Sequence, residues 1–176
     1  MTTLNRRPAK SANPAGAGSA SARAAGRAAS LFLDNQLCFA LYATSLAMTK
    51  VYRPLLAPLD LTYPQYIVML ALWEHRELTV GKLGGQVGLD SGTLVPLIRK
   101  LTAQGLVLRQ RSTTDDRSVL ISLTPAGALM SERAHAVHDR VACATQRTPP
   151  ERQALARNLH SLRAALLQDA TAKPAM

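Results

Sequence analysis

The chain has 176 residues, of which 47% are hydrophobic and 18% charged, and its net charge is +10. This length suffices for one domain with a real core, and the hydrophobic content excludes a chain that is disordered throughout. No apolar run approaches about 18 uncharged residues, so we expect no membrane span. The positive charge favours a polyanionic partner.

Residues 1–30 are rich in Ala, Ser, Gly and Pro, and they carry five basic residues and no acidic one. They lack the hydrophobic stretch of a secretory signal, so we expect a disordered basic tail. The tail is either a solubilising extension, which we favour, or a source of non-specific phosphate affinity; its composition also suits a transit peptide. Two cysteines without a secretory signal indicate a reducing compartment, here the cytoplasm.

Apolar residues recur at spacings near three and four from Leu33 to Leu55, which predicts an amphipathic helix. Pro54 and Pro58 should end it. Thr62 or Tyr63 should then cap a strongly apolar helix.

A helix-turn-helix follows this apolar helix. Thr79 is a candidate N-cap for a short helix over residues 80–87, which Gly88 should stop. Asp90 or Ser91 should cap a second helix that ends at Gly105. Two short helices joined by a tight glycine turn are typical of a DNA-binding helix-turn-helix.

Two strand candidates, residues 106–111 and 119–123, flank a polar tip and predict a β-hairpin wing. Two helices should follow, one opened by Thr124 and one opened by the capping-box spacing of Thr148 and Glu151. The fold class is therefore mainly α with a small β-hairpin wing. The outer helices have apolar faces that need a partner, for which a second copy is economical.

The expected organisation has four parts, in chain order. They are a disordered tail (1–30), a sensor and dimerisation region (31–62), a winged helix-turn-helix DNA-binding domain (63–124) and C-terminal dimerisation helices (125–176).

Candidate DNA contacts lie on the second helix of the helix-turn-helix and on the wing, because the second helix enters the major groove with its N-terminal residues at the base edges. Each residue alone is equally compatible with a solvated surface charge, whereas the adjacent basic elements favour DNA. The candidates are Asp90, Ser91, Thr93, Val95, Arg99, Lys100, Arg109, Arg111, Asp115 and Arg117. Arg117 is long enough for a minor groove, and Asp115 is placed to orient it.

Cys38 lies on the first predicted helix, one turn before Tyr42. Phenol hydroxyls can donate hydrogen bonds to a thiolate, the nucleophilic form of cysteine. Tyr52 has a similar helical angle, but fourteen residues place it roughly 21 Å along the axis. If Tyr52 contacts a Cys38, that cysteine must belong to another subunit, and Tyr63 could close the same pocket. The alternative is that these tyrosines only pack in a core or interface.

Several segments resemble the MarR-type regulators, and more closely the OhrR-type sensors of organic hydroperoxide. The winged helix-turn-helix is general to MarR-type proteins, whereas the first two segments are more specific. The segments are residues 33–39 (LDNQLCF), 59–66 (LDLTYPQY), 89–94 (LDSGTL) and 117–124 (RSVLISLT).

This resemblance implies a dimeric MarR-like architecture: a homodimer that binds an inverted-repeat operator and represses a peroxide-detoxifying gene. It implies that organic hydroperoxide oxidises Cys38, with Tyr42, Tyr52 and Tyr63 as thiolate-stabilising residues. It also implies a two-cysteine type, in which Cys143 of the partner forms an intersubunit disulfide with Cys38 and DNA is released. An inert Cys143 is the alternative.

Other functions stay open. A MarR-type regulator of a small aromatic or acidic ligand would respond without Cys38, a thiol peroxidase would turn over with a reductant, and an architectural protein would ignore inverted repeats. We expect no enzyme, because no catalytic triad, paired carboxylates or phosphate loop is present. We expect no cofactor and no metal site, because His135 and His138 with Asp139 do not complete a ligand set.

Overall fold

The structure is a computed structural model that describes residues 30–111 and 118–171. The chain divides into two compact units, one up to Met48 and one from Thr49 onward. This division falls inside helix α2 (Leu37–Leu56). The four-part organisation expected from the sequence stays a prediction.

The first unit contains a short 3-10 turn, η2 (Leu33–Asn35), and the beginning of α2. Gln36 between them has extended backbone angles, so the helix begins at Leu37 and not at Leu33. The Gln36 side chain donates hydrogen bonds to the carbonyls of Ser30 and Phe32. These local contacts hold the segment that leads into Cys38.

The second unit begins within α2, which ends at Leu56 between the two prolines as expected. A 3-10 turn, η3 (Ala57–Leu59), leads to α3 (Tyr63–His75). Thr62 is the N-cap of α3, and its backbone N–H and hydroxyl both donate to Oε1 of Gln65 at 2.8 Å. This capping box satisfies donors that the first helical turn leaves unpaired.

The helix-turn-helix consists of α4 (Val80–Val87) and α5 (Ser91–Ala103), as the sequence predicted. The wing strands are β2 (Val107–Arg111) and β3 (Val119–Leu123). A third strand, β1 (Glu77–Thr79), pairs antiparallel with β3, so the sheet order is β1-β3-β2. The sequence does not predict β1, because three residues are too few to show an alternating pattern.

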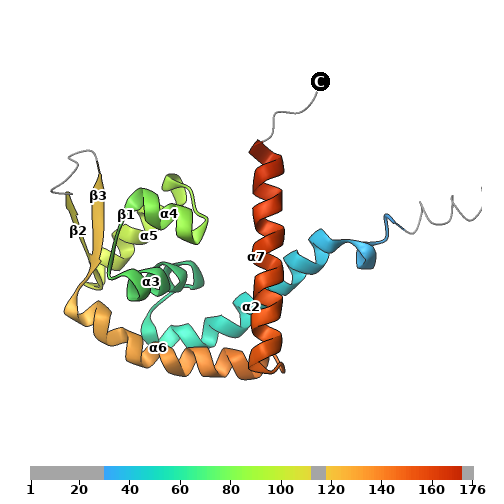
Figure 1. Ribbon diagram of the computed structural model, residues 1–176. Coiled ribbons are helices and arrows are strands. Elements are labelled where there is room, and N and C mark those ends of the chain that lie inside the picture. The colour runs from blue at the N-terminus through green and yellow to red at the C-terminus, as the bar shows by residue number, and fades with distance from the viewer. Residues whose placement is uncertain (1–29, 112–117, 172–176) are drawn as a thin grey trace, which may run out of the picture. The chain divides into compact units, whose positions relative to one another are not determined.

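The core of the second unit lies where α3, α4 and α5 pack beside the sheet (Figure 1). Side chains from all of these elements are fully buried there. They include Leu72, Leu83, Leu94, Leu101 and Ile121, each with 0% exposure. The winged helix-turn-helix therefore closes a hydrophobic core from its own residues.

Gly127, in the first turn of α6 (Pro125–Ala144), packs closely against Leu106 and Trp73. A Cβ atom at this position would lie 2.0 Å from the carbonyl oxygen of Leu106, so only glycine permits this approach. The carbonyl of Gly127 accepts a hydrogen bond of 2.8 Å from Nε1 of Trp73. The start of α6 is thereby fixed to α3 and to the turn before β2.

The last helix, α7 (Pro149–Thr171), begins with the expected capping box, because Thr148 N–H donates to Glu151 at 2.7 Å. No residue of α7 is buried. Among the described residues no single helix is long and apolar enough to span a membrane. One pair of helical segments joined at a bend, Leu37–Leu59 and Tyr63–His75, reaches that length and composition only when the two are taken together. Six residues of α3 are buried in the core.

Candidate functional site

The turn between α4 and α5 is fixed by local backbone chemistry. Gly88 ends α4 with a left-handed φ of 71°, a conformation that favours glycine. Asp90, and not Ser91, is the N-cap of α5, since its carboxylate accepts a hydrogen bond of 2.9 Å from the backbone N–H of Thr93. This hydrogen bond, followed by one from the Thr93 hydroxyl, lowers the pKa of Asp90. The structure thus gives Asp90 a capping role.

One face of α5 is available for contacts with DNA. Ser91, Thr93 and Arg99 are exposed and Val95 is half-buried, whereas Leu94, Ile98 and Leu101 point into the core. The Thr93 hydroxyl also donates to Asp90 at 3.1 Å. The exposed face therefore carries hydroxyl, apolar and guanidinium groups, which suit base edges and phosphates.

Two of the predicted arginines come together between α5 and the wing. Arg99 and Arg109 line one hollow of about 170 Å³, together with Val95. Arg109 and Arg111 are both exposed and lie two residues apart on β2, so they share one face of the strand. This geometry continues a positive surface from the helix onto the wing.

Lys100 directly follows Arg99 on α5. It lines a different groove, of about 540 Å³, together with Asp60 and Gln104 near the start of α3. Its phosphate contact stays a prediction. The wing-tip candidates Asp115 and Arg117 lie outside the described residues, so their roles stay predictions.

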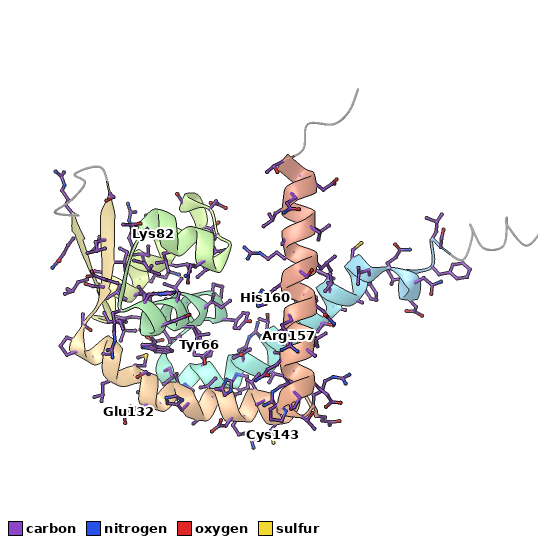
Figure 2. All side chains as sticks on the ribbon, in the orientation of Figure 1. Tyr66, Lys82, Glu132, Cys143, Arg157 and His160 are labelled. Carbon is purple, nitrogen blue, oxygen red and sulfur yellow. The ribbon has the colours of Figure 1, made fainter. Side chains whose placement is uncertain are left out.

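Both cysteines are free and exposed. Cys38 is the second residue of α2, and Cys143 is the residue before the last of α6. The side chain of Cys143 points outward from its helix (Figure 2). Each thiol is therefore accessible to an oxidant or to another thiol. Tyr42 is also exposed, at 62%, one turn after Cys38.

Tyr52 and Tyr63 lie together, although they come from different helices. Their ring centroids are 4.5 Å apart, and the ring of Tyr66 is 5.6 Å from that of Tyr52. Trp73 extends the group, with its ring edge-on to Tyr66 at 6.0 Å. We call Tyr52, Tyr63 and Tyr66 the tyrosine cluster. Tyr66 is not among the predicted site residues, although its position one turn after Tyr63 is a signal.

The environment of the tyrosine cluster keeps its phenols protonated. Burial, followed by the neighbouring Tyr63 and Tyr66, raises the pKa of Tyr52 to about 12. Burial likewise raises the pKa of Tyr63, and burial together with Tyr63 raises that of Tyr66. A protonated phenol can donate a hydrogen bond to a thiolate or to a peroxide oxygen.

A groove of about 510 Å³ runs between α3 and α6 beside the tyrosine cluster. Tyr66 belongs to both, and Leu70 and Trp73 continue the apolar wall along α3. His135 and His138, which the sequence analysis considered as metal ligands, line this groove instead. Within the described residues no group of three or more His, Cys, Asp or Glu side chains could hold a metal ion.

Residues 50–133 match the family described as transcriptional regulator SarA/Rot. The organic hydroperoxide resistance transcriptional regulator of Bacillus subtilis is 60% identical over 102 residues, covering 58% of this chain and 69% of the relative. The regulator TtmR of Methylorubrum extorquens is 47% identical over 131 residues, covering 74% of this chain and 67% of the relative.

The structure of AbfR from Staphylococcus epidermidis is similar, with a TM-score of 0.66 and 32% identity, covering 77% of this chain and 94% of that protein. AbfR structures are described as reduced and bound to DNA, overoxidized and bound to DNA, and disulfide-formed. The winged helix-turn-helix fold and these relatives agree with the sequence segments that resemble MarR-type and OhrR-type regulators. The chain belongs to the MarR-type winged helix-turn-helix transcriptional regulators and is a homologue of the organic hydroperoxide resistance regulators.

Proposed function

We propose that this regulator is a repressor that senses organic hydroperoxide through Cys38. The observation that supports this most directly is the tyrosine cluster, whose protonated phenols are suited to bind a thiolate. Cys38 adds an accessible sulfur in the first turn of α2, where the helix dipole stabilises negative charge. The 60% identical relative named for organic hydroperoxide resistance supports the choice of oxidant.

The proposed site is shared between two subunits. Tyr52 lies fourteen residues after Cys38 in one continuous helix, a distance of roughly 21 Å along the axis. The cluster therefore receives Cys38 of the partner subunit. Tyr42, one turn from Cys38 on the exposed side of α2, completes the pocket from the same subunit as the sulfur.

The chemistry proceeds in two steps. The Cys38 thiolate attacks the terminal oxygen of the hydroperoxide, the O–O bond breaks, and the alcohol leaves after taking up a proton, which gives a sulfenic acid. A thiol of Cys143 from the partner then attacks this sulfur, forming a disulfide and releasing water. The Cα atoms must approach within about 7 Å, and if the reduced cysteines lie farther apart, the helix movement that joins them would change the spacing of the two recognition helices.

DNA release follows from this change of spacing, because the half-sites of an inverted repeat demand a fixed separation. The DNA surface is formed by Ser91, Thr93, Val95, Arg99, Arg109 and Arg111. Arg109→Ala should weaken binding by about 1–3 kcal/mol if it reaches a base, or flatten the salt dependence if it contacts phosphate. In this proposal the protein is an operator-binding repressor and not an enzyme. It would act in the cytoplasm.

The test combines non-reducing electrophoresis with DNA binding. Wild type, Cys38→Ser and Cys143→Ser are treated with cumene hydroperoxide, and binding is measured on a duplex that the reduced protein selects from a random-sequence library. Only wild type should form a covalent dimer and lose DNA. If wild type loses DNA without a covalent dimer, Cys143 has no resolving role. If Cys38→Ser responds as wild type does, the peroxide-sensing proposal is wrong.

A second candidate is a regulator of a small aromatic or acidic ligand, with the thiol incidental. The groove between α3 and α6 favours it, because aromatic and apolar side chains there adjoin Arg76. In that case benzoate, and not hydroperoxide, would release DNA from both wild type and Cys38→Ser.

A further inference from the structure

Arg163 of the last helix, α7, reaches the turn of the helix-turn-helix. A Cβ atom at Gly88 would lie 2.6 Å from Nη2 of Arg163 and 3.5 Å from its Cζ. The guanidinium group therefore covers the side of Gly88 on which any other residue would carry its side chain. Because no residue of α7 is buried, this contact is not part of a shared hydrophobic core. It is a polar contact between two elements that lie far apart in the sequence.

The C-terminal end of α4, where this contact lies, attracts a cation. The carbonyl of Gly84 accepts the N–H groups of both Gly88 and Leu89, the latter at 3.0 Å. The last carbonyls of a helix lack donors within it, and the aligned peptide dipoles give this end a partial negative charge. Residues 83–90 include one acidic residue, Asp90, and no lysine or arginine. A guanidinium from α7 supplies the positive charge and the N–H donors that this turn lacks.

Two glycines of the helix-turn-helix show that the space at Gly88 has a particular use. Gly88 and Gly105 both have a φ of 71°, a conformation that by itself favours glycine. A Cβ atom at Gly105 would meet nothing within 4 Å, whereas one at Gly88 would meet the guanidinium of Arg163. Gly88 is therefore required both by its backbone conformation and by the approach of α7.

We propose that Arg163 is a positioning residue for DNA recognition, which holds the helix-turn-helix at a fixed orientation relative to α7. Helix α5 begins at Ser91, three residues after Gly88, so the turn sets the direction of the recognition helix. The inference rests on the proposed function, in which a homodimer binds an inverted repeat, and on the predicted role of α7 in dimerisation. A tie between the turn and a dimerising helix restricts the separation of the two recognition helices, which the half-sites require to be fixed.

Operators of altered spacing test this role. The reduced protein is titrated with the duplex that it selects and with duplexes that have one base pair more or fewer between the half-sites. Each change alters the separation by about 3.4 Å and the rotation by about 35°. Wild type should prefer the selected duplex. In Arg163→Gln the ratio of dissociation constants should fall by about threefold or more, because each of two subunits loses a contact that typically contributes a factor of about two to five.

Two further variants separate position from charge and from stability. Arg157→Gln removes the same charge from α7, but six residues place Arg157 about 240° around the helix from Arg163. It should weaken binding to all three duplexes alike and keep the ratio. Arg163→Lys retains a cation on a long side chain and should recover most of the ratio, because the attraction to a helix end depends on charge. A loss of folded protein lowers binding to every duplex equally, so it leaves the ratio unchanged.

Hydrogen exchange measures the contact in the absence of DNA. In Arg163→Gln the backbone amides of Gly88 and Leu89 should exchange faster than in wild type, and Arg157→Gln should match wild type. Unchanged exchange in Arg163→Gln would show that the guanidinium does not hold the turn. Faster exchange with an unchanged ratio of dissociation constants would overturn the positioning role.

The outcomes also distinguish this inference from the proposed function. If wild type prefers one spacing and responds to cumene hydroperoxide, while Arg163→Gln keeps the wild-type ratio, only this inference fails. If Arg163→Gln loses the preference while wild type ignores cumene hydroperoxide, only the sensing proposal fails. If wild type binds all three duplexes equally, the inverted-repeat operator and the positioning role are both wrong.

Discussion

The winged helix-turn-helix and the last helix, α7, bury their apolar side chains to different extents. Leu83 and Leu94 of α4 and α5 are completely buried within one chain, whereas Leu159 and Leu166 of α7 are 41% and 58% exposed. The first region packs three helices against a sheet, and its apolar faces meet one another. The apolar side of α7 is exposed in a single chain, and its role in dimerisation stays a prediction.

Local contacts explain how α7 can still begin at a defined residue. The capping box of Thr148 and Glu151 satisfies backbone donors at its start, but an isolated helix is only marginally stable in water. Tertiary or quaternary burial must supply the rest. The same reasoning applies to the exposed residues 31–37 before Cys38.

The largest expected effect is the loss of a buried leucine from the winged helix-turn-helix. Leu94→Ala should lower the free energy of unfolding by about 2–5 kcal/mol, because it removes burial and leaves a cavity. Urea unfolding followed by circular dichroism and by Trp73 fluorescence measures this. Leu108→Ala, at an exposed leucine of β2 (46%), is the matched control and should change the free energy of unfolding much less. Equal effects would contradict the burial of Leu94.

Leu159→Asp on α7 should weaken dimerisation by more than about tenfold, because a leucine that becomes buried in a subunit interface contributes roughly 1.5–3 kcal/mol and a carboxylate opposes that burial. Sedimentation equilibrium measures the dissociation constant. The helix-turn-helix should keep its near-ultraviolet spectrum, since its core does not include α7. An unchanged dissociation constant would place the subunit interface elsewhere.

Thr124 offers a smaller perturbation at the joint between the wing and α6. Its hydroxyl donates to the carbonyl of Gly105 at 2.7 Å and accepts from the N–H of Gly127 at 2.9 Å. Thr124→Val keeps the shape and loses both contacts, so thermal unfolding should report a loss of about 0.5–2 kcal/mol. Thr124→Ser retains the hydroxyl and should recover most of it. Failure of Ser to do so would assign the effect to the methyl group.

The smallest expected effect is the alkaline behaviour of the tyrosine cluster. An ordinary tyrosine has a pKa of 10.0, whereas the pKa of Tyr52 is raised to about 12. Between these two pH values the folded state retains a proton that the unfolded state loses. The contribution of protonated Tyr52 to stability is complete below pH 10.0 and is lost as pH rises through about 12. Tyr52→Phe should make the decline of stability over this window shallower. Urea unfolding across this range measures it, with Tyr42→Phe, outside the cluster, as the control.

The sequence alone determined the features that depend on neighbours along the chain. Thr79, Thr124 and Thr148 were identified as helix starts because a capping side chain bonds a backbone group within about three residues. The glycine stop at Gly88 follows from its left-handed conformation. The same local patterns, with the segment around Cys38, were enough to indicate the family.

Tertiary structure decided what depends on residues far apart in the chain. Strand β1 exists because β3, more than forty residues later, pairs with it. Arg99 and Arg109 line the same hollow while Lys100 lines another groove, because helix rotation and sheet packing set the direction of each side chain. Tyr66 joins Tyr52 and Tyr63 for the same reason. Local sequence fixes where helices begin and end, but only packing fixes which of their faces meet.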